Sequence, residues 1–171
     1  APGPYTIGTA SAATCTLAAV ANTYNDRISG NWSDPSTWAP DSGYPQQGDT
    51  AVIDSHVVSL GGSLTAAAAP DRIVVAQDGT LLIGHNSEEV VDSPLQFNGG
   101  TLRRQGRGQT VVNGPLDIVS AALLDVSGGD SWMLRHAFII DGAVTGPGRV
   151  MFAGTGNRRL TSAAGLTFGG G

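Results

Sequence analysis

The chain of 171 residues has no lysine, a single cysteine and few charges, with Asp, Glu and Arg making up 13% of it. The one thiol, Cys15, excludes an internal disulfide and an all-cysteine metal site. Because Cys15 lies among small and apolar residues, we expect a buried, inert thiol, with a bridge to a neighbouring copy as the alternative. The net charge of −5 argues against nucleic acid as a partner, since binding to a phosphate backbone needs clustered cations.

Long apolar stretches are also missing. The sequence therefore predicts no membrane-spanning helix, which would need about 18 consecutive apolar residues. The chain begins Ala-Pro-Gly-Pro, with neither an initiator Met nor a basic segment. This start is typical of a mature terminus after removal of a signal peptide, or of a boundary inside a longer sequence. We expect a secreted, extracellular or cell-surface protein.

The sequence also lacks the motifs that are typical of catalysis and cofactor binding. The sequence has no glycine-rich phosphate loop between a strand and a helix and no Gly-x-Ser-x-Gly elbow. His56, His85 and His136 lack metal-ligand spacing. We predict no catalytic residue, no metal site and no cofactor. The alternative is a fragment of a β-helical polysaccharide lyase or hydrolase, which works with carboxylates on one lateral face. Its candidate acids are Asp117, Asp125, Asp130 and Asp141.

What the sequence does have is a regular spacing of glycines in its second half. Alternating apolar pairs precede several of these glycines, as in Leu124 with Val126 and Phe138 with Ile140. Alternation directs both members of a pair to one face and the residue between them outward, so Asp125 is expected to point outward. The glycines at intervals of 14 residues, each after a turn-type residue, are Gly100, Gly114, Gly128, Gly142, Gly156 and Gly170.

We interpret the 14-residue unit as strand, turn, strand, turn, with a glycine that permits a positive φ at the corner. Stacked units bury a continuous core that no single unit could form. The sequence thus predicts an all-β fold, a parallel β-helix (β-solenoid) with a short N-terminal capping or donated segment. Whether 14 residues form a whole narrow coil or part of a larger one stays open. The same spacing predicts an ion pair between Arg103 and Asp117 on neighbouring units.

Composition divides the chain into regions. Residues 1–30 are rich in Ala and Thr. They are predicted to cap the solenoid or to be donated to a neighbour as a strand, with Thr14–Ala21 either a short helix or a strand. Residues 31–171 are predicted to form the β-solenoid. Within it, residues 31–60 form an aromatic, turn-rich first rung, and residues 61–171 form the repetitive rungs.

Aromatic side chains gather in this first rung, at Trp32, Trp38 and Tyr44. Such rings can stack on sugar rings with a large contact surface. These three are therefore the candidate glycan-binding residues. The alternative is a hydrophobic plug that seals the first rung, with Trp32 and Trp38 packed inward.

Part of the repeat resembles the autotransporter-associated β-strand repeats of bacterial passenger proteins. The matching segments are Leu95-Gln-Phe-Asn-Gly-Gly-Thr-Leu-Arg, Val111-Val-Asn-Gly-Pro-Leu-Asp-Ile and Leu123-Leu-Asp-Val-Ser-Gly-Gly. The resemblance covers residues 90–171 and implies a right-handed parallel β-helix exported to the cell surface. The opening Trp32-Ser-Asp-Pro-Ser-Thr-Trp, with Gly48-Asp-Thr-Ala-Val-Ile downstream, resembles the first part of G8-type surface modules. Neither family implies a catalytic residue in this chain.

Together these features predict a non-catalytic structural β-helix, either an adhesive shaft or a subunit that assembles end to end into a filament. The repeat runs to Gly170 without a charged cap, and an uncapped solenoid end tends to add another copy. The expected partners are copies of the chain or the rest of a longer surface protein. Glycans are the expected partners under the alternative of a carbohydrate-binding module.

Overall fold

The computed structural model describes residues 20–84, 88–119, 121–126, 131–154 and 156–161, and in these ranges the chain is almost entirely strands and turns. A 3-10 turn, η1 (Pro35–Thr37), lies between β2 and β3. The strands are β1 (Thr23–Asp26), β2 (Gly30–Asn31), β3 (Trp38–Ala39), β4 (Thr50–Ile53), β5 (Val57–Leu60), β6 (Arg72–Ala76), β7 (Thr80–Ile83), β8 (Glu89–Val91), β9 (Leu95–Asn98), β10 (Thr101–Arg104), β11 (Gln109–Val112), β12 (Leu116–Ile118), β13 (Leu123–Asp125), β14 (Ser131–Leu134), β15 (Phe138–Ile140), β16 (Ala143–Thr145), β17 (Arg149–Phe152) and β18 (Arg158–Leu160).

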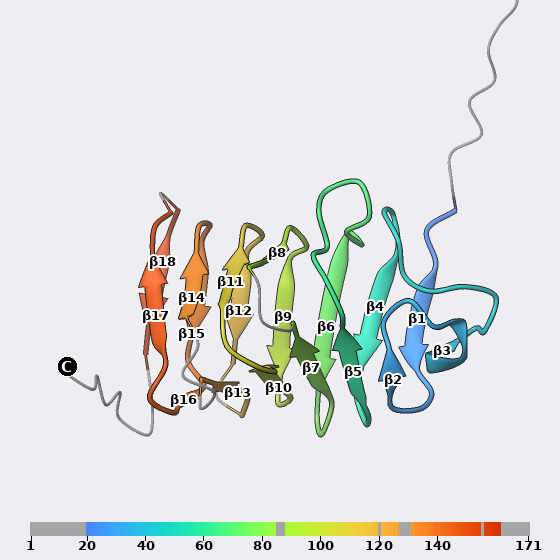
Figure 1. Cartoon of the computed structure of the whole chain (residues 1–171), viewed down its shortest axis with the longest axis horizontal. Coiled ribbons are helices and arrows are strands. Elements are labelled where there is room, and N and C mark those ends of the chain that lie inside the picture. Colours follow the sequence, from blue (N-terminus) through green and yellow to red (C-terminus); the bar gives the residue numbers. More distant parts are fainter. Residues whose placement is uncertain (1–19, 85–87, 120, 127–130, 155, 162–171) are drawn as a thin grey trace, which may run out of the picture.

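The strands form three sheets that run along the long axis of the molecule (Figure 1). Sheet A has the order β18-β15-β12-β9-β6-β4-β1-β3, sheet B the order β16-β13-β10-β7-β5-β2, and sheet C the order β17-β14-β11-β8. Neighbouring strands pair in parallel, except that β3 is antiparallel to β1. The chain therefore winds as a parallel β-solenoid, which confirms the predicted fold class.

Each full coil has three sides and takes about 21 residues. In sheet A, Leu95 pairs with Leu116 and Leu116 with Phe138, so the register advances by 21 and then 22 positions. One side with its corner thus takes about seven residues, and the 14-residue spacing in the sequence covers two sides of a three-sided coil. The 14-residue unit is therefore part of a larger coil and not a whole narrow coil.

Four of the periodic glycines lie at corners of the coil within the described residues: Gly100 and Gly142 between sheets A and B, and Gly114 and Gly156 between sheets C and A. The predicted corner positions are confirmed, but the positive φ that glycine permits is not used, because none of the four is among the positive-φ residues. What they provide is close approach between coils. A Cβ on Gly114 would overlap the backbone carbonyl oxygen of Ser93, and one on Gly142 would overlap that of Ala122. Both carbonyls lie one coil back.

The core lies inside the coils as rows of apolar side chains in register. In sheet A, one row runs through Ile73, Leu95, Leu116 and Phe138, all buried. A row in sheet B runs through Val58, Leu81, Leu102 and Leu124, which are fully buried. Each coil therefore covers the apolar side chains of the coil before it, which is the physical reason why a single unit could not fold alone.

The solenoid begins before residue 31, where we placed the boundary of the N-terminal segment. β1 already pairs in parallel with β4, and β2 with β5, so residues 23–31 belong to the first coil. Residues 1–19 lie outside the described residues. The helix-or-strand alternative for Thr14–Ala21 and the state of Cys15 therefore stay predictions.

The corner glycines supply a matched test of the coil geometry. We expect Gly114→Ala to lower the free energy of unfolding by about 1–3 kcal/mol, because the added methyl group must push neighbouring coils apart. Gly61→Ala is the control, since a Cβ there meets nothing within 4 Å, and its effect should stay within about 0.5 kcal/mol. Chemical denaturation measures both, and equal effects would contradict the close-approach account.

Candidate functional site

Two of the three candidate glycan-binding residues form the apolar plug of the first coil. Trp38 is fully buried and Trp32 is 3% exposed. The two rings meet edge to face, with centroids 5.0 Å apart. Trp38 Nε1 donates to the carbonyl oxygen of Trp32 at 2.8 Å, and Trp32 Nε1 donates to that of Pro45 at 3.3 Å. Trp38 therefore has no ring face available to a ligand, in keeping with the plug alternative.

Tyr44 and the edge of Trp32 do line a hollow on the surface, beside the end of β5. Its volume is about 260 Å³. Tyr44 is half-buried, and small residues such as Gly62 also line the hollow. The full lining is Trp32, Ser33, Tyr44, Leu60, Gly61, Gly62, Ser63, Leu64 and Ala68. The hollow lies where sheet C has no full strand, only the bridge from Leu64 to Val91. Of the predicted glycan site, the structure keeps together the pair Trp32 and Tyr44.

A second polar arrangement, which the sequence analysis missed, joins the first two coils through Asp26. The Asp26 side chain is fully buried and accepts hydrogen bonds from the backbone N–H groups of Asp54 at 3.0 Å, Ser55 at 3.1 Å and His56 at 2.7 Å. The His56 ring nitrogen Nδ1 lies 2.8 Å from the same carboxylate. These four contacts hold the corner between β4 and β5 against the end of β1.

The electrostatics of Asp26 follow from these contacts. Burial alone would raise the pKa of its carboxyl group, but hydrogen bonds from the Asp54 and Ser55 backbone, the His56 ring and the His56 backbone outweigh burial and hold the pKa below 3.8. An imidazole oriented by a carboxylate resembles the base-and-orienter half of a nucleophilic site. Within the described part of the chain, no hydroxyl group hydrogen-bonds to the His56 ring. The four contacts of Asp26 clamp the corner between β4 and β5 to the end of β1.

A third polar arrangement lies inside the solenoid, between the coils of β7–β8 and β10–β11. Arg104 forms an ion pair with Glu89, and their side chains are 0% and 4% exposed. Arg104 Nη1 also donates to Thr110 Oγ1 at 2.7 Å. Thr110 pairs in register with Glu89 on one side and Trp132 on the other. A paired and hydrogen-bonded charge is what a buried site demands, so this cluster serves internal packing.

The candidate carboxylates of the enzyme alternative are distributed over different sides of the solenoid. Asp117 lies in sheet A and Asp125 in sheet B. Asp125 lies between two buried apolar residues and pairs with Arg103 at 3.5 Å. The predicted pair of Arg103 with Asp117 is therefore wrong, because strands in register are 22 residues apart here. Asp141 lies 3.7 Å from Arg159 at a further corner, and Asp130 falls outside the described residues.

The remaining candidate groups show no convergence. His136 is exposed on a turn, and His85 lies outside the described residues. Over residues 20–84, 88–119, 121–126, 131–154 and 156–161, no group of three or more His, Cys, Asp or Glu could hold a metal ion. The same ranges contain no helix long and apolar enough to cross a membrane. No sequence pattern indicates the Asp26–His56 or Glu89–Arg104 contacts, because each depends on the number of residues per coil.

Comparison of the chain with protein-family models, with curated proteins and with solved structures finds no match.

The Asp26 clamp predicts an acid-sensitive stability. A carboxyl group with a lowered folded-state pKa stabilises the fold fully above its ordinary value of 3.8, and this contribution is lost as the pH falls through the folded-state pKa. At neutral pH, Asp26→Asn should cost about 1.5–3 kcal/mol, since hydrogen bonds to a charged acceptor are lost.

The measurement is the free energy of unfolding of both proteins between about pH 2 and 7. The wild type should lose more stability on acidification than Asp26→Asn does. Asp78→Asn, at an exposed corner, is the control and should follow the wild-type profile. Parallel profiles for wild type and Asp26→Asn would contradict the clamp.

Proposed function

We propose that the chain is a non-catalytic structural β-solenoid of the cell surface or extracellular space, acting as an adhesive shaft or as a subunit that assembles end to end. The observation that carries the proposal is the continuous parallel pairing of the coils along one axis (Figure 1). Backbone hydrogen bonds and apolar rows link every coil to the next, which makes a stiff rod from short units. The buried polar contacts of Asp26 with the Asp54 backbone and of Arg104 with Glu89 also join coils.

Surface location and the absence of catalysis are tested together. Antibodies against the folded chain should label intact cells of the source organism, and exposure of those cells to protease should remove the label. Labelling that needs permeabilised cells would contradict a surface role. The purified chain should release no product from uronic-acid polymers. Release that disappears in Asp125→Asn would favour the polysaccharide-cleaving alternative instead.

A second candidate function, carbohydrate binding, is favoured by the hollow beside Trp32 and Tyr44. Aromatic rings, small residues and hydroxyl groups together line this hollow, and such a mixture suits the apolar and polar faces of one sugar ring. The volume of about 260 Å³ is small for a binding pocket, so the ligand would be a single residue of a glycan.

This candidate predicts that two different variants weaken glycan binding. Tyr44→Ala removes an aromatic wall and should weaken binding by roughly tenfold. Gly62→Val should block the hollow without disturbing the coil, because a Cβ at Gly62 meets nothing within 4 Å. The control is Gln47→Ala, at an exposed position outside the lining. A glycan array without signal, or full binding by Gly62→Val, would rule this function out.

A further inference from the structure

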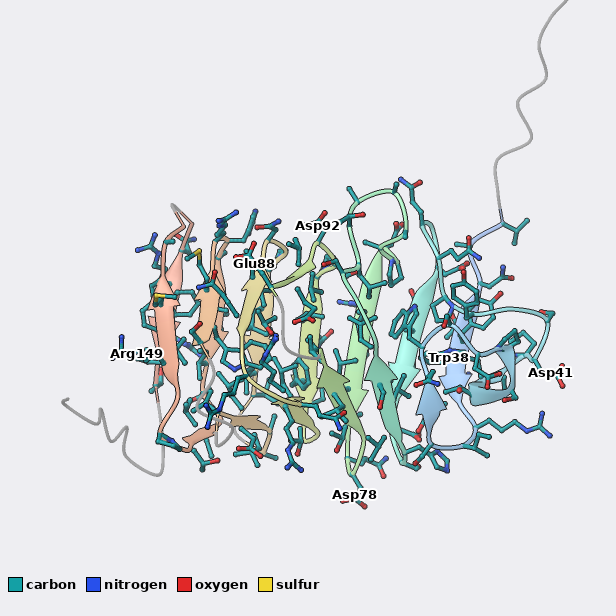
Figure 2. The ribbon with its side chains drawn as sticks, in the orientation of Figure 1. Trp38, Asp41, Asp78, Glu88, Asp92 and Arg149 are labelled. Carbon is teal, nitrogen blue, oxygen red and sulfur yellow. The ribbon has the colours of Figure 1, made fainter. Side chains whose placement is uncertain are left out.

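The two ends of the described solenoid carry opposite charge. Residues 20–49, which form the first coil and lead into the second, contain four aspartates and one arginine, a net charge of −3. Residues 131–154 and 156–161, which form the last coils, contain four arginines and one aspartate, a net charge of +3. Figure 2 shows Asp41 at one end of the axis and Arg149 at the other. The described part of the molecule therefore carries opposite net charges at the two ends of its stacking axis.

At the cationic end the described strands lack a second neighbour, as β2 in sheet B and β8 in sheet C do toward the other end. β16, β17 and β18 each stand first in the order of their sheets and pair on one side only. Arg149 and Arg158 are exposed there, and no ion pair within the described ranges involves them. Phe152 beside them is 37% exposed.

Arg158 takes a position that is apolar in earlier coils. It pairs in register with Phe138, which continues the inward row of Leu95 and Leu116. A charged residue in register with an inward row disfavours indiscriminate strand addition at the edge, because an added strand would bury the charge without a partner. A partner surface that supplies carboxylates can pair with Arg158, so this arginine favours an acidic surface as the one that covers this end.

The acidic end offers such carboxylates. Asp34 and Asp41 are exposed on the segment around η1. Asp41 pairs with Arg27 at 3.3 Å, but the two side chains are 72% and 58% exposed, so solvent screens this pair and Asp41 remains accessible. β3, antiparallel to β1, closes the edge of sheet A at this end. At the edge of sheet A, a second molecule therefore meets the antiparallel β3 and these charged side chains, whereas β2 in sheet B pairs on one side.

We propose that copies of the chain associate head to tail, with the acidic first coil of one copy against the cationic last coil of the next. This rests on the proposed structural function and gives the assembly its polarity. Contact between two cationic ends would bring Arg149 and Arg158 of both copies together, which like-charge repulsion opposes. A head-to-tail contact joins different surfaces and leaves both outer ends free, so its repetition builds an open filament.

The test is sedimentation of the full chain of 171 residues. At about 20 mM salt, the weight-average mass should rise above 17.3 kDa with concentration. At about 500 mM salt, where charges are screened beyond a few ångströms, the dissociation constant should rise at least tenfold.

Charge reversal then identifies the surfaces. The tail variant Arg149→Glu/Arg158→Glu and the head variant Asp34→Lys/Asp41→Lys should each stay monomeric at low salt, whereas their mixture should associate, because both junctions are again complementary. The matched control Arg72→Glu/Arg107→Glu changes net charge by the same amount at exposed positions along the shaft and should associate as the wild type does. Asp34 caps η1, so its replacement could unfold the head variant. If circular dichroism shows that the Asp34→Lys/Asp41→Lys variant is unfolded, Asp41→Lys/Ser42→Lys takes its place.

A wild type that stays monomeric at low salt, or a tail variant that associates like the wild type, would overturn the proposal. Binding of dextran sulfate by the wild type but not by the tail variant, without self-association, would overturn it in favour of a polyanionic partner. The antibody labelling of intact cells tests the proposed surface function and does not depend on self-association. Failure of the head-to-tail proposal can therefore be told apart from failure of the proposed function.

Discussion

Backbone hydrogen bonding between successive coils is the interaction on which the rest of this structure depends. It sets neighbouring strands about 4.8 Å apart. The backbones of successive corners must therefore pack at the same short distance. Where Gly100, Gly114, Gly142 and Gly156 turn the chain, a methyl group would meet the preceding coil. The apolar rows follow from the same constraint, because side chains one coil apart are held in contact whatever lies between them in the sequence.

A stack of coils has two ends, and this chain treats them differently. The first coil is closed by the Trp32–Trp38 plug, by the antiparallel strand β3 and by the carboxylate of Asp26, which binds the next corner. At the other end, the described strands have one neighbour each, and Arg158 occupies an otherwise apolar row. Charge at an edge limits what can be added to it, so the two ends differ in chemistry as well as shape.

Local alternation in the sequence predicted much of the fold correctly. The pairs Leu124–Val126 and Phe138–Ile140 are buried, and Asp125 and Ile139 between them point outward, as the period of a strand requires. The coil length was not accessible in this way, because each side with its corner takes about seven residues and the glycines mark every second corner. The ion pair expected between Arg103 and Asp117 failed for that reason, since Arg103 lies beside Asp125 of the next coil.

The sequence by itself thus determined the class of fold, the inward and outward positions of its strands and the places where the chain must turn. Each of these follows from forces between residues that are close in the chain. Only the tertiary structure decided which corners share a coil, that Asp26 binds the backbone around Ser55, that Arg104 pairs with Glu89 inside the solenoid, and that opposite charges collect at opposite ends. These features depend on the number of residues per coil, and the packing of the whole stack sets that number.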